Sequence, residues 1–498
     1  MPVRLDKIRQ RSPSQQYAAS PDNNAATIQG KPMKSFHQKT PALMCASVLL
    51  FGMSVAAGVS HAKGKPVTPT PNEWGDTREH DSRTYTPFVA PLAPLPGFAS
   101  EIFTGVLKGS AYQLEVPQNW NEMLVMYAHG FRGEGPTLFA NAPAALRPWL
   151  LANGYAWAAS SYSANSYDVR AGVEDTNALA LAFGEITGRA EPTKYYITGH
   201  SMGGHVAAAA VEAETLATAN NRVRYAGAVP MCGVTGDTYQ FEYLMNYTFA
   251  AQHLAGLGPT GYPPTDYQAK LPQIIGTLWT SYPTQPNPLG LKLENITRDL
   301  TGGDRPYFAE GFRTTLQNTV LGTGGGDGRI NGILAKPLTG NQGVRYNVDG
   351  QPGQSAEERR FNQTILRVIG HPPANGLRDD GLRWIPVING EFEVPVVSIH
   401  TLGDLFVPFK HMQIHRERAE AKGNGELLVQ RAVRAPSHCD FSVQEQVSAF
   451  AAMIDWEQNG NKPMGDDVLD AQLVANPDYG CTFTNPQRPG LPACSTGL

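Results

Sequence analysis

The sequence predicts an α/β fold with a mostly parallel central sheet and helices on both faces. Three observations favour this class. Strand-like and helix-like stretches alternate up to residue 232, which is typical of parallel sheets. Residues 123–128 are continuously apolar, as is usual for a strand buried on both faces. A Gly-x-Ser-x-Gly sequence at residues 199–203 joins a strand-like run to an alanine-rich helical run.

The expected elements of this first part alternate along the chain. The strands cover residues 99–116 (two strands with a turn at 108–110), 123–128, 155–161, 195–198 and 225–231. The helices cover residues 143–153, 173–187 and 206–217. Gly154 and Gly188 supply end signals for the first two helices.

The alternation breaks after residue 232. Residues 233–390 hold amphipathic pieces between Gly- and Pro-rich stretches, which predicts an inserted cap domain; the pieces cover 243–257, 267–282, 308–318 and 356–369. The sheet then resumes with a strand at 394–400, a helix at 413–422, a strand at 426–431 and a helix at 443–456.

The start of the chain carries an export signal. A basic flank at 33–39 precedes an apolar run at 42–59 and the small-residue site Ser60-His61-Ala62, which predicts a signal peptide cleaved after Ala62. A transmembrane anchor is the alternative interpretation. The predicted segments are an upstream extension (1–32), signal peptide (33–62), linker or extended arm (63–98), core (99–232), cap (233–390), core (391–459) and C-terminal wrap (460–498).

Four of the five cysteines remain after the signal peptide. An even number in an exported protein predicts two disulfides. Cys481 and Cys494 bracket a short loop and are expected to pair, which leaves Cys232 with Cys439. Free buried thiols are the alternative.

Ser201 is the candidate nucleophile. A serine between Gly199 and Gly203, after a strand and before a helix, is placed on a sharp turn that exposes its hydroxyl. The glycines leave room because they carry no Cβ. An ordinary glycine-rich turn is the alternative.

Two further residues complete a catalytic set. Asp404 follows a valine-rich strand, and His438 follows the last strand, so both are expected at the carboxyl edge of the sheet. The chain order Ser, Asp, His is that of an α/β-hydrolase triad. His438 would act as the base, Asp404 would orient it, and the N–H groups of Met202 and Phe131 would form the oxyanion hole.

These motifs resemble the α/β-hydrolase superfamily, in particular secreted bacterial serine hydrolases of the esterase/lipase and prolyl-oligopeptidase-like kind. The resemblance covers residues 101–456 and implies the α/β-hydrolase fold. One motif departs from many lipases and carboxylesterases: they carry His-Gly-Gly at the oxyanion loop, whereas here Phe131 follows His129-Gly130. This places a large ring at the mouth of the site. In tannase-like and feruloyl-esterase-like enzymes a disulfide ties the serine and histidine loops; Cys439 is similarly placed, but Ser201 has no adjacent cysteine.

Other residue groups do not point to a further catalytic, metal or nucleic-acid site. His129, His200 and His205 lack the spacing of a metal site, so structural or oxyanion-loop roles are expected, with no metal and no cofactor. The glycines at 324–328 are expected to form a flexible turn. The net charge of −4 does not favour a nucleic-acid partner. Six cap aromatics form either the core of the cap or a substrate wall: Phe241, Tyr243, Tyr247, Phe249, Tyr307 and Phe308.

The sequence therefore predicts a secreted or periplasmic serine hydrolase that cleaves a carboxylic ester, in a small molecule or a polymer, through an acyl-enzyme at Ser201. An amidase or peptidase with the same triad is one alternative. A non-catalytic binding protein on a hydrolase scaffold is another, against which the intact set of Ser201, Asp404 and His438 counts.

Overall fold

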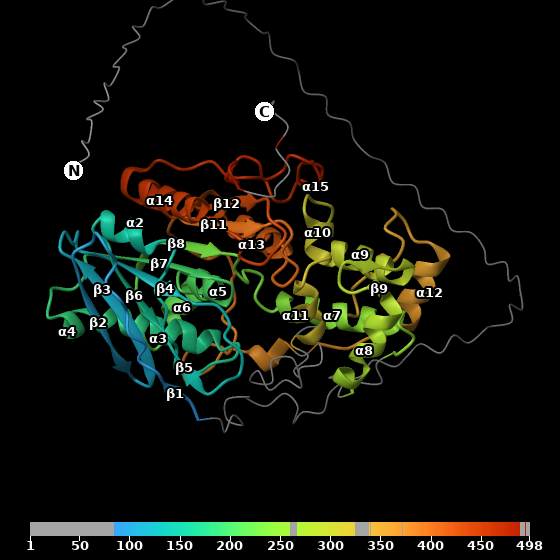
Figure 1. The fold of residues 1–498 in the computed structure, drawn as a ribbon, viewed down its shortest axis with the longest axis horizontal. Helices are drawn as coiled ribbons and strands as arrows, with labels where there is room; N and C mark the ends of the chain where they lie inside the picture. Colours follow the sequence, from blue (N-terminus) through green and yellow to red (C-terminus); the bar gives the residue numbers. More distant parts are fainter. Residues whose placement is uncertain are drawn as a thin grey trace, which may run out of the picture. The chain divides into compact units, whose positions relative to one another are not determined.

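An eight-stranded sheet organises the described part of the chain (Figure 1). The structure is a computed structural model that describes residues 84–258, 266–323, 338, 340–370, 372–488 and 494. The strands are β2 (Ser100–Leu107), β3 (Ser110–Pro117), β4 (Met123–Ala128), β6 (Ala156–Ser160), β7 (Lys194–His200), β8 (Tyr225–Met231), β11 (Val396–Thr401) and β12 (Leu428–Val433). Their order is β12-β11-β8-β7-β4-β6-β3-β2, and β3 alone runs against both its neighbours, which confirms a mostly parallel sheet.

Helices cover both faces of the sheet. The alternation of side chains along β4 shows this: Leu124 and Met126 belong to one hydrophobic cluster and Val125 to the other. Helices α3 (Val169–Leu181) and α5 (Met202–Ala209) contribute to the first cluster, and α2 (Arg147–Ala152) and α14 (Val443–Asn459) to the second. The prediction that helices cover both faces of the sheet is thus confirmed.

Local signals set several helix ends. Asp168 caps α3 by accepting a hydrogen bond from the Ala171 N–H. Ser442 and Glu445 form a reciprocal capping box at the start of α14, and Gly460, with φ 75°, ends it. Gly188, with φ 68°, ends α4 (Phe183–Thr187), as the sequence predicts.

The helix predicted over residues 206–217 is two helices. Helix α5 begins at Met202 and α6 covers Ala213–Thr218. Between them, the buried carboxylate of Glu212 accepts hydrogen bonds of 2.9 Å from the N–H groups of Gly390 and Glu391. This long-range contact lies where α5 and α6 separate. The local alanine-rich sequence does not indicate such a contact, so it predicts one continuous helix.

The segment after β8 forms helices that lie together beside the sheet, at the right of Figure 1. They are α7 (Tyr239–Leu254), α8 (Tyr267–Leu278), α9 (Pro288–Leu300), α10 (Phe308–Phe312), α11 (Leu316–Thr323) and α12 (Ala356–Thr364), with the short strand pair β9 (Trp279–Ser281) and β10 (Gln285–Pro286) between α8 and α9. Helix α9 is absent from the sequence prediction, although Asn287 caps it and Pro288 occupies its first position.

Two helices and one short strand pair complete the α-helices and β-strands of the described residues. Helices α13 (Lys410–Ala421) and α15 (Ala471–Val474) flank β12, and β1 (Thr86–Pro87) pairs with β5 (Thr137–Leu138). The C-terminal segment covers the edge strand β12: Asp466 bonds to the backbone of Gln430 and Ala432, and Thr484 accepts from the Arg434 N–H.

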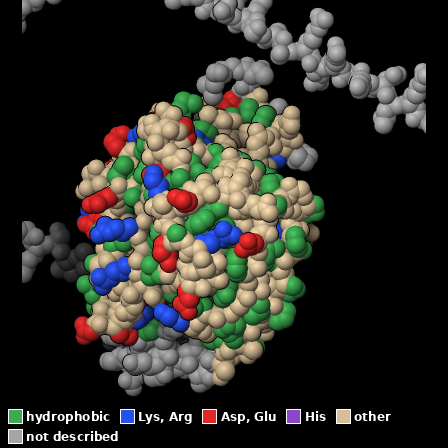
Figure 2. Space-filling model, turned by 90° about the vertical axis from the view of Figure 1, so that its left-hand side faces the viewer, with side chains coloured by type: hydrophobic (Ala, Val, Ile, Leu, Met, Phe, Trp, Pro, Cys, Tyr) green, Lys and Arg blue, Asp and Glu red, His purple; other side chains and the backbone are tan. Residues whose placement is uncertain are grey.

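Several predictions concern residues that the structure does not describe. The upstream extension, the signal peptide, most of the arm and the glycine turn at 324–328 lie outside the described residues. Within the described ranges, none of the helices is long and apolar enough to cross a membrane. On the face seen in Figure 2, basic side chains are interspersed with acidic ones, in keeping with 40 Lys and Arg against 44 Asp and Glu in the sequence.

Candidate active site

Ser201 lies on a strained turn between β7 and α5. Its backbone has φ 59° and ψ −122°, a conformation that residues with a Cβ rarely adopt. Tight packing imposes it: a Cβ at Gly203 would overlap the carbonyl oxygen of Ala128 at the end of β4. The Ser201 N–H is bonded to the Met231 carbonyl at 3.0 Å. The Gly-x-Ser-x-Gly sequence therefore forms the predicted elbow.

The loops after β11 and β12 bring Asp404 and His438 into contact. Oδ2 of Asp404 lies 2.6 Å from Nδ1 of His438. The other carboxylate oxygen accepts hydrogen bonds from the N–H groups of Phe406 (2.9 Å) and Val407 (3.0 Å). Asp404 is fully buried and the His438 side chain is 17% exposed. The carboxylate is thus fixed, and it favours the His438 tautomer that carries its proton on Nδ1.

A disulfide joins the His438 loop to the strand beside the elbow strand. Cys232, which follows β8, is bonded to Cys439, and Cys481 is bonded to Cys494, so both predicted pairs are confirmed. Sγ of Cys439 lies 3.3 Å from Nε2 of His438. Cys232, Cys439 and His438 form a cluster of potential metal ligands, but the bonded sulfurs offer no thiolate.

Burial lowers the pKa of His200, the residue before Ser201, to about 4, and the charge of His438 contributes to this lowering. Both Ser201 and His438 belong to the described residues, and no hydrogen bond joins them. Hydrogen bonds between a nucleophile and its base are often long before substrate binds.

The loop after β4 contacts the elbow. A Cβ at Gly130 would lie 3.1 Å from the Cβ and 3.7 Å from the Oγ of Ser201, so only glycine leaves this approach open. The next residue, Phe131, and the first residue of α5, Met202, are the predicted oxyanion donors. The first N–H groups of a helix have no partner within it, which leaves the Met202 N–H available.

His129 shapes this loop from a buried position. Its ring stacks on Tyr162 with centroids 4.0 Å apart, and Nε2 lies 3.1 Å from the Ser161 carbonyl. Arg132 donates to Nδ1 at 3.0 Å. Burial and the charge of Arg132 lower the pKa of His129 to about 3, so the ring is neutral and structural.

The two other histidines near the elbow also have protein partners. His200 contacts Tyr127 through Nδ1 (3.3 Å) and Gln446 through Nε2 (3.0 Å). His205 contacts Tyr167 through Nδ1 (2.9 Å) and the Pro386 carbonyl through Nε2 (2.7 Å). The sequence predicts structural or oxyanion-loop roles for these histidines.

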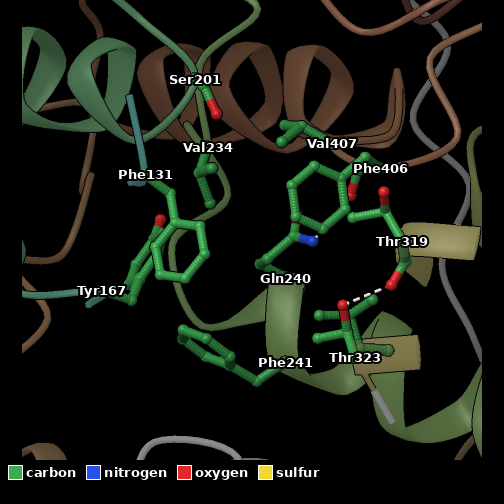
Figure 3. A pocket seen from close by; sticks show the side chains of 11 residues that line it. Phe131, Tyr167, Ser201, Val234, Gln240, Phe241, Thr319, Thr323, Phe406 and Val407 are labelled. Atoms are coloured by element: carbon green, nitrogen blue, oxygen red, sulfur yellow. Dashed lines mark hydrogen bonds between the residues drawn. The ribbon is translucent and has the colours of Figure 1, made fainter. Parts of the chain in front are cut away.

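A cavity of about 150 Å³ opens beside Ser201 (Figure 3). The predicted oxyanion residue Phe131 and the cap aromatic Phe241 line it. The other five cap aromatics do not line it; Tyr307 and Phe308 border a separate, polar cavity, and Tyr243, Tyr247 and Phe249 are fully buried.

Sequence reasoning missed most of the lining. Tyr167, Gln240, Leu244 and Thr319 come from three places in the chain, since Gln240 and Leu244 both lie on α7, and only the fold brings these places together. Phe406 could have been suspected, since it lies two residues after Asp404.

Comparisons with known proteins give one relative and a set of weak structural likenesses. No family model matches the chain. The chain is 24% identical to "o-phthalyl amidase" from Xanthobacter agilis over 408 residues, which cover 71% of this chain and 86% of the relative.

Three solved structures illustrate the structural likenesses. Feruloyl esterase B from Aspergillus oryzae is 14% identical with a TM-score of 0.37, and the alignment covers 74% of this chain and 82% of that one. Thermogutta terrifontis esterase 2 is 13% identical with a TM-score of 0.34, covering 74% and 97%. The acylaminoacyl peptidase of Pyrococcus horikoshii is 11% identical with a TM-score of 0.34; 75% of this chain aligns to it, and this chain spans 44% of its length.

At such TM-scores the fold assignment depends on the features described above. The sheet is mostly parallel with β3 reversed, helices cover both faces, and a strand–turn–helix elbow carries Ser201 at the carboxyl end of an inner strand. The chain has the α/β-hydrolase fold that its motifs predicted.

Proposed function

We propose that the protein is a serine hydrolase that cleaves carboxylic esters through an acyl-enzyme at Ser201. One observation supports this most: the buried carboxylate of Asp404 contacts Nδ1 of His438 at 2.6 Å, on loops at the same edge of the sheet as the strained Ser201 turn. A buried acid that orients an imidazole beside a serine is the arrangement that activates a hydroxyl nucleophile.

Each residue then has a definite role. Nε2 of His438 takes the proton of Ser201 Oγ as the oxygen attacks the ester carbonyl carbon. The N–H groups of Met202 and Phe131 stabilise the negative oxygen of the tetrahedral intermediate. As the ester C–O bond breaks, His438 returns the proton to the leaving alkoxide. Water, deprotonated by His438, then attacks the acyl-Ser201 ester and releases the acid. Asp404 stabilises the imidazolium in both steps.

An amidase is the second candidate, because the relative at 24% identity bears the name "o-phthalyl amidase". The same residues serve both reactions, and the difference lies in the leaving group. An amine leaves only after protonation by His438, whereas an activated alkoxide departs without it. Esters therefore demand less of the His438 geometry.

The test compares two substrates that share the acetyl group. We expect p-nitrophenyl acetate to be turned over with a higher kcat/KM than p-nitroacetanilide, and an organophosphonate probe to label the tryptic peptide that contains Ser201. Equal kcat/KM values for the ester and the anilide would favour the amidase. If the protein shows neither turnover nor labelling, a non-catalytic binding protein becomes the better interpretation. The exposed-serine variant Ser281→Ala is the labelling control.

The disulfide next to His438 gives a second prediction. Because Cys439 adjoins the base and Cys232 anchors it to β8, Cys232→Ser/Cys439→Ser should lower kcat by up to about 10²-fold, the loss that a displacement of roughly 1 Å can cause. KM should change little, since neither cysteine lines the cavity. Steady-state kinetics well below the melting temperature would measure this.

Cys481→Ser/Cys494→Ser is the matched control, because it removes a disulfide whose cysteines do not adjoin His438 in the sequence. A kcat equal to that of the control would mean that the Cys232–Cys439 bond does not position the base.

We also propose that the helices of residues 233–390 form the predicted cap over the site. Gln240, Phe241 and Leu244 of α7 and Thr319 and Thr323 of α11 line the cavity at Ser201, which supports this role. The two disulfides are typical of exported proteins and support a secreted or periplasmic location.

A further inference from the structure

The cavity beside Ser201 has a definite size and chemistry (Figure 3). It lies between the oxyanion loop with Phe131, helices α7 and α11, and the loop that carries Phe406. We propose, on the basis of the serine hydrolase function above, that this cavity is the acyl pocket and that it takes one uncharged aromatic ring, as in a benzoyl group.

The volume sets the size of the acyl group. A cavity of about 150 Å³ is comparable in volume to one that binds benzene, and much of its lining is apolar, namely Phe131, Val234, Phe241, Leu244, Phe406 and Val407. A two-ring or long-chain acyl group exceeds this space, whereas an acetyl group leaves most of it unfilled. One six-membered ring is therefore the best fit.

The walls suit a planar ring. Phe131, Phe241 and Phe406 line the cavity, and Tyr167 contacts Phe241 edge-to-face with centroids 5.4 Å apart and planes at 88°. Figure 3 shows the rings of Phe131, Tyr167 and Phe241 clustered on one side of the cavity. Aromatic pairs prefer such edge-to-face or offset contacts, so these rings can grip an aryl group from several sides.

Three polar side chains of the lining, those of Gln240, Tyr167 and Thr323, have partners within the protein. Gln240 donates to the Phe406 carbonyl (2.8 Å) and contacts Nε2 of His411 (2.8 Å). The Tyr167 hydroxyl contacts Nδ1 of His205, whose Nε2 faces the Pro386 carbonyl. The Thr323 hydroxyl donates to the Thr319 carbonyl at 2.5 Å.

No charged side chain is among the described residues that line the cavity. A carboxylate on the bound ring would thus be buried without a counter-ion, which is costly. The pocket should reject acyl groups with an anionic ring substituent.

The position of His438 assigns the cavity to the acyl side. The leaving group must reach Nε2 of His438 to receive its proton. His438 does not line the cavity, but its ring packs edge-to-face on Phe406, which does, at 5.5 Å and 88°. Because His438 is not among the described residues that line the cavity, we assign the group inside it to the acyl part of the substrate and not to the leaving group.

The experiment varies the acyl group and keeps p-nitrophenol as the leaving group. We expect the kcat/KM of the benzoate to exceed that of the acetate by roughly tenfold or more. The kcat/KM values of the decanoate and the 2-naphthoate should be lower than that of the benzoate. The 3-methylbenzoate should be preferred over the equally bulky 3-carboxybenzoate by roughly 10²-fold. Equal rates within either pair would overturn the proposal.

A variant that fills the cavity tests the location. Leu244→Phe should reduce the benzoate-to-acetate ratio of kcat/KM, because Leu244 lines the cavity. Leu291→Phe makes the same change at an exposed position of α9 and should leave the ratio unchanged. An unchanged ratio in Leu244→Phe would place the ring elsewhere.

A binding measurement separates this proposal from the hydrolase function. Calorimetric titration of the Ser201→Ala protein should show binding of methyl benzoate and weaker binding of monomethyl isophthalate. If no ester is turned over but this preference holds, the esterase function is wrong and the ring pocket stands. Turnover of esters with no preference for a ring contradicts the pocket alone.

Discussion

Replacement of Ser201 by alanine is expected to lower kcat for p-nitrophenyl esters by about 10⁶-fold, the loss seen when the nucleophile of a serine hydrolase is removed. The hydroxyl oxygen is the atom that forms the acyl-enzyme, and alanine has nothing in its place. Residual activity should come only from the oxyanion donors and substrate binding.

The fold should tolerate this change. Serine and alanine carry the same Cβ, so the strain at φ 59° is similar, and among the described residues the Ser201 side chain forms no hydrogen bond that alanine would lose. Circular dichroism and the melting temperature should therefore match those of the parent protein. Ser281→Ala, at an exposed position, controls for the removal of a hydroxyl. Turnover within tenfold of the parent rate would show that Ser201 is not the nucleophile.

The core strands could be predicted from the sequence because their signals are local. The apolar run Met123–Ala128 and the run Tyr225–Met231 coincide with β4 and β8 residue for residue. Side chains buried on both faces leave a continuous hydrophobic pattern that does not depend on distant contacts. The same is true of the elbow, since Gly199 and Gly203 mark a turn that only small residues allow.

The start of α5 could not be placed so well. The alanine-rich run that predicts the helix begins at Val206, whereas the helix begins at Met202 and includes Gly203 and Gly204, which are poor helix formers. Tertiary packing overrides propensity here: the helix must pass close to Ala128, and glycine is what permits this approach. At this turn the close approach to Ala128 requires glycine, whereas helix propensity disfavours glycine.

The order of the candidate catalytic residues followed from the sequence, but their surroundings did not. Asp404 and His438 are 34 positions apart, which leaves room for one helix and one strand, and these are α13 and β12. The contact of Asp404 with the N–H groups of Phe406 and Val407, and the aromatic wall of the cavity, arise from loop conformation and from α7 and α11. Such long-range contacts leave no pattern in a single sequence.

Asp404→Asn is expected to lower kcat by about 10⁴-fold while the fold is retained. The asparagine Oδ1 can still accept hydrogen bonds from the N–H groups of Phe406 and Val407, so the loop keeps its conformation. Its Nδ2 would then face Nδ1 of His438, and an N–H group cannot accept a proton from another. His438 must shift its proton to Nε2, where it can no longer take the proton of Ser201. Steady-state kinetics on p-nitrophenyl acetate would measure the loss.

The matched control is Asp379→Asn, which removes a carboxylate from an exposed position and should leave kcat unchanged. KM separates the two ways in which Asp404→Asn could fail. A wrong tautomer impairs the chemical step and leaves the cavity intact, so KM should stay close to the parent value, whereas a displaced loop would move Phe406 and Val407 and raise KM as well. A kcat within tenfold of the parent value would mean that another group orients His438, because the observed 2.6 Å contact would then contribute little to the reaction.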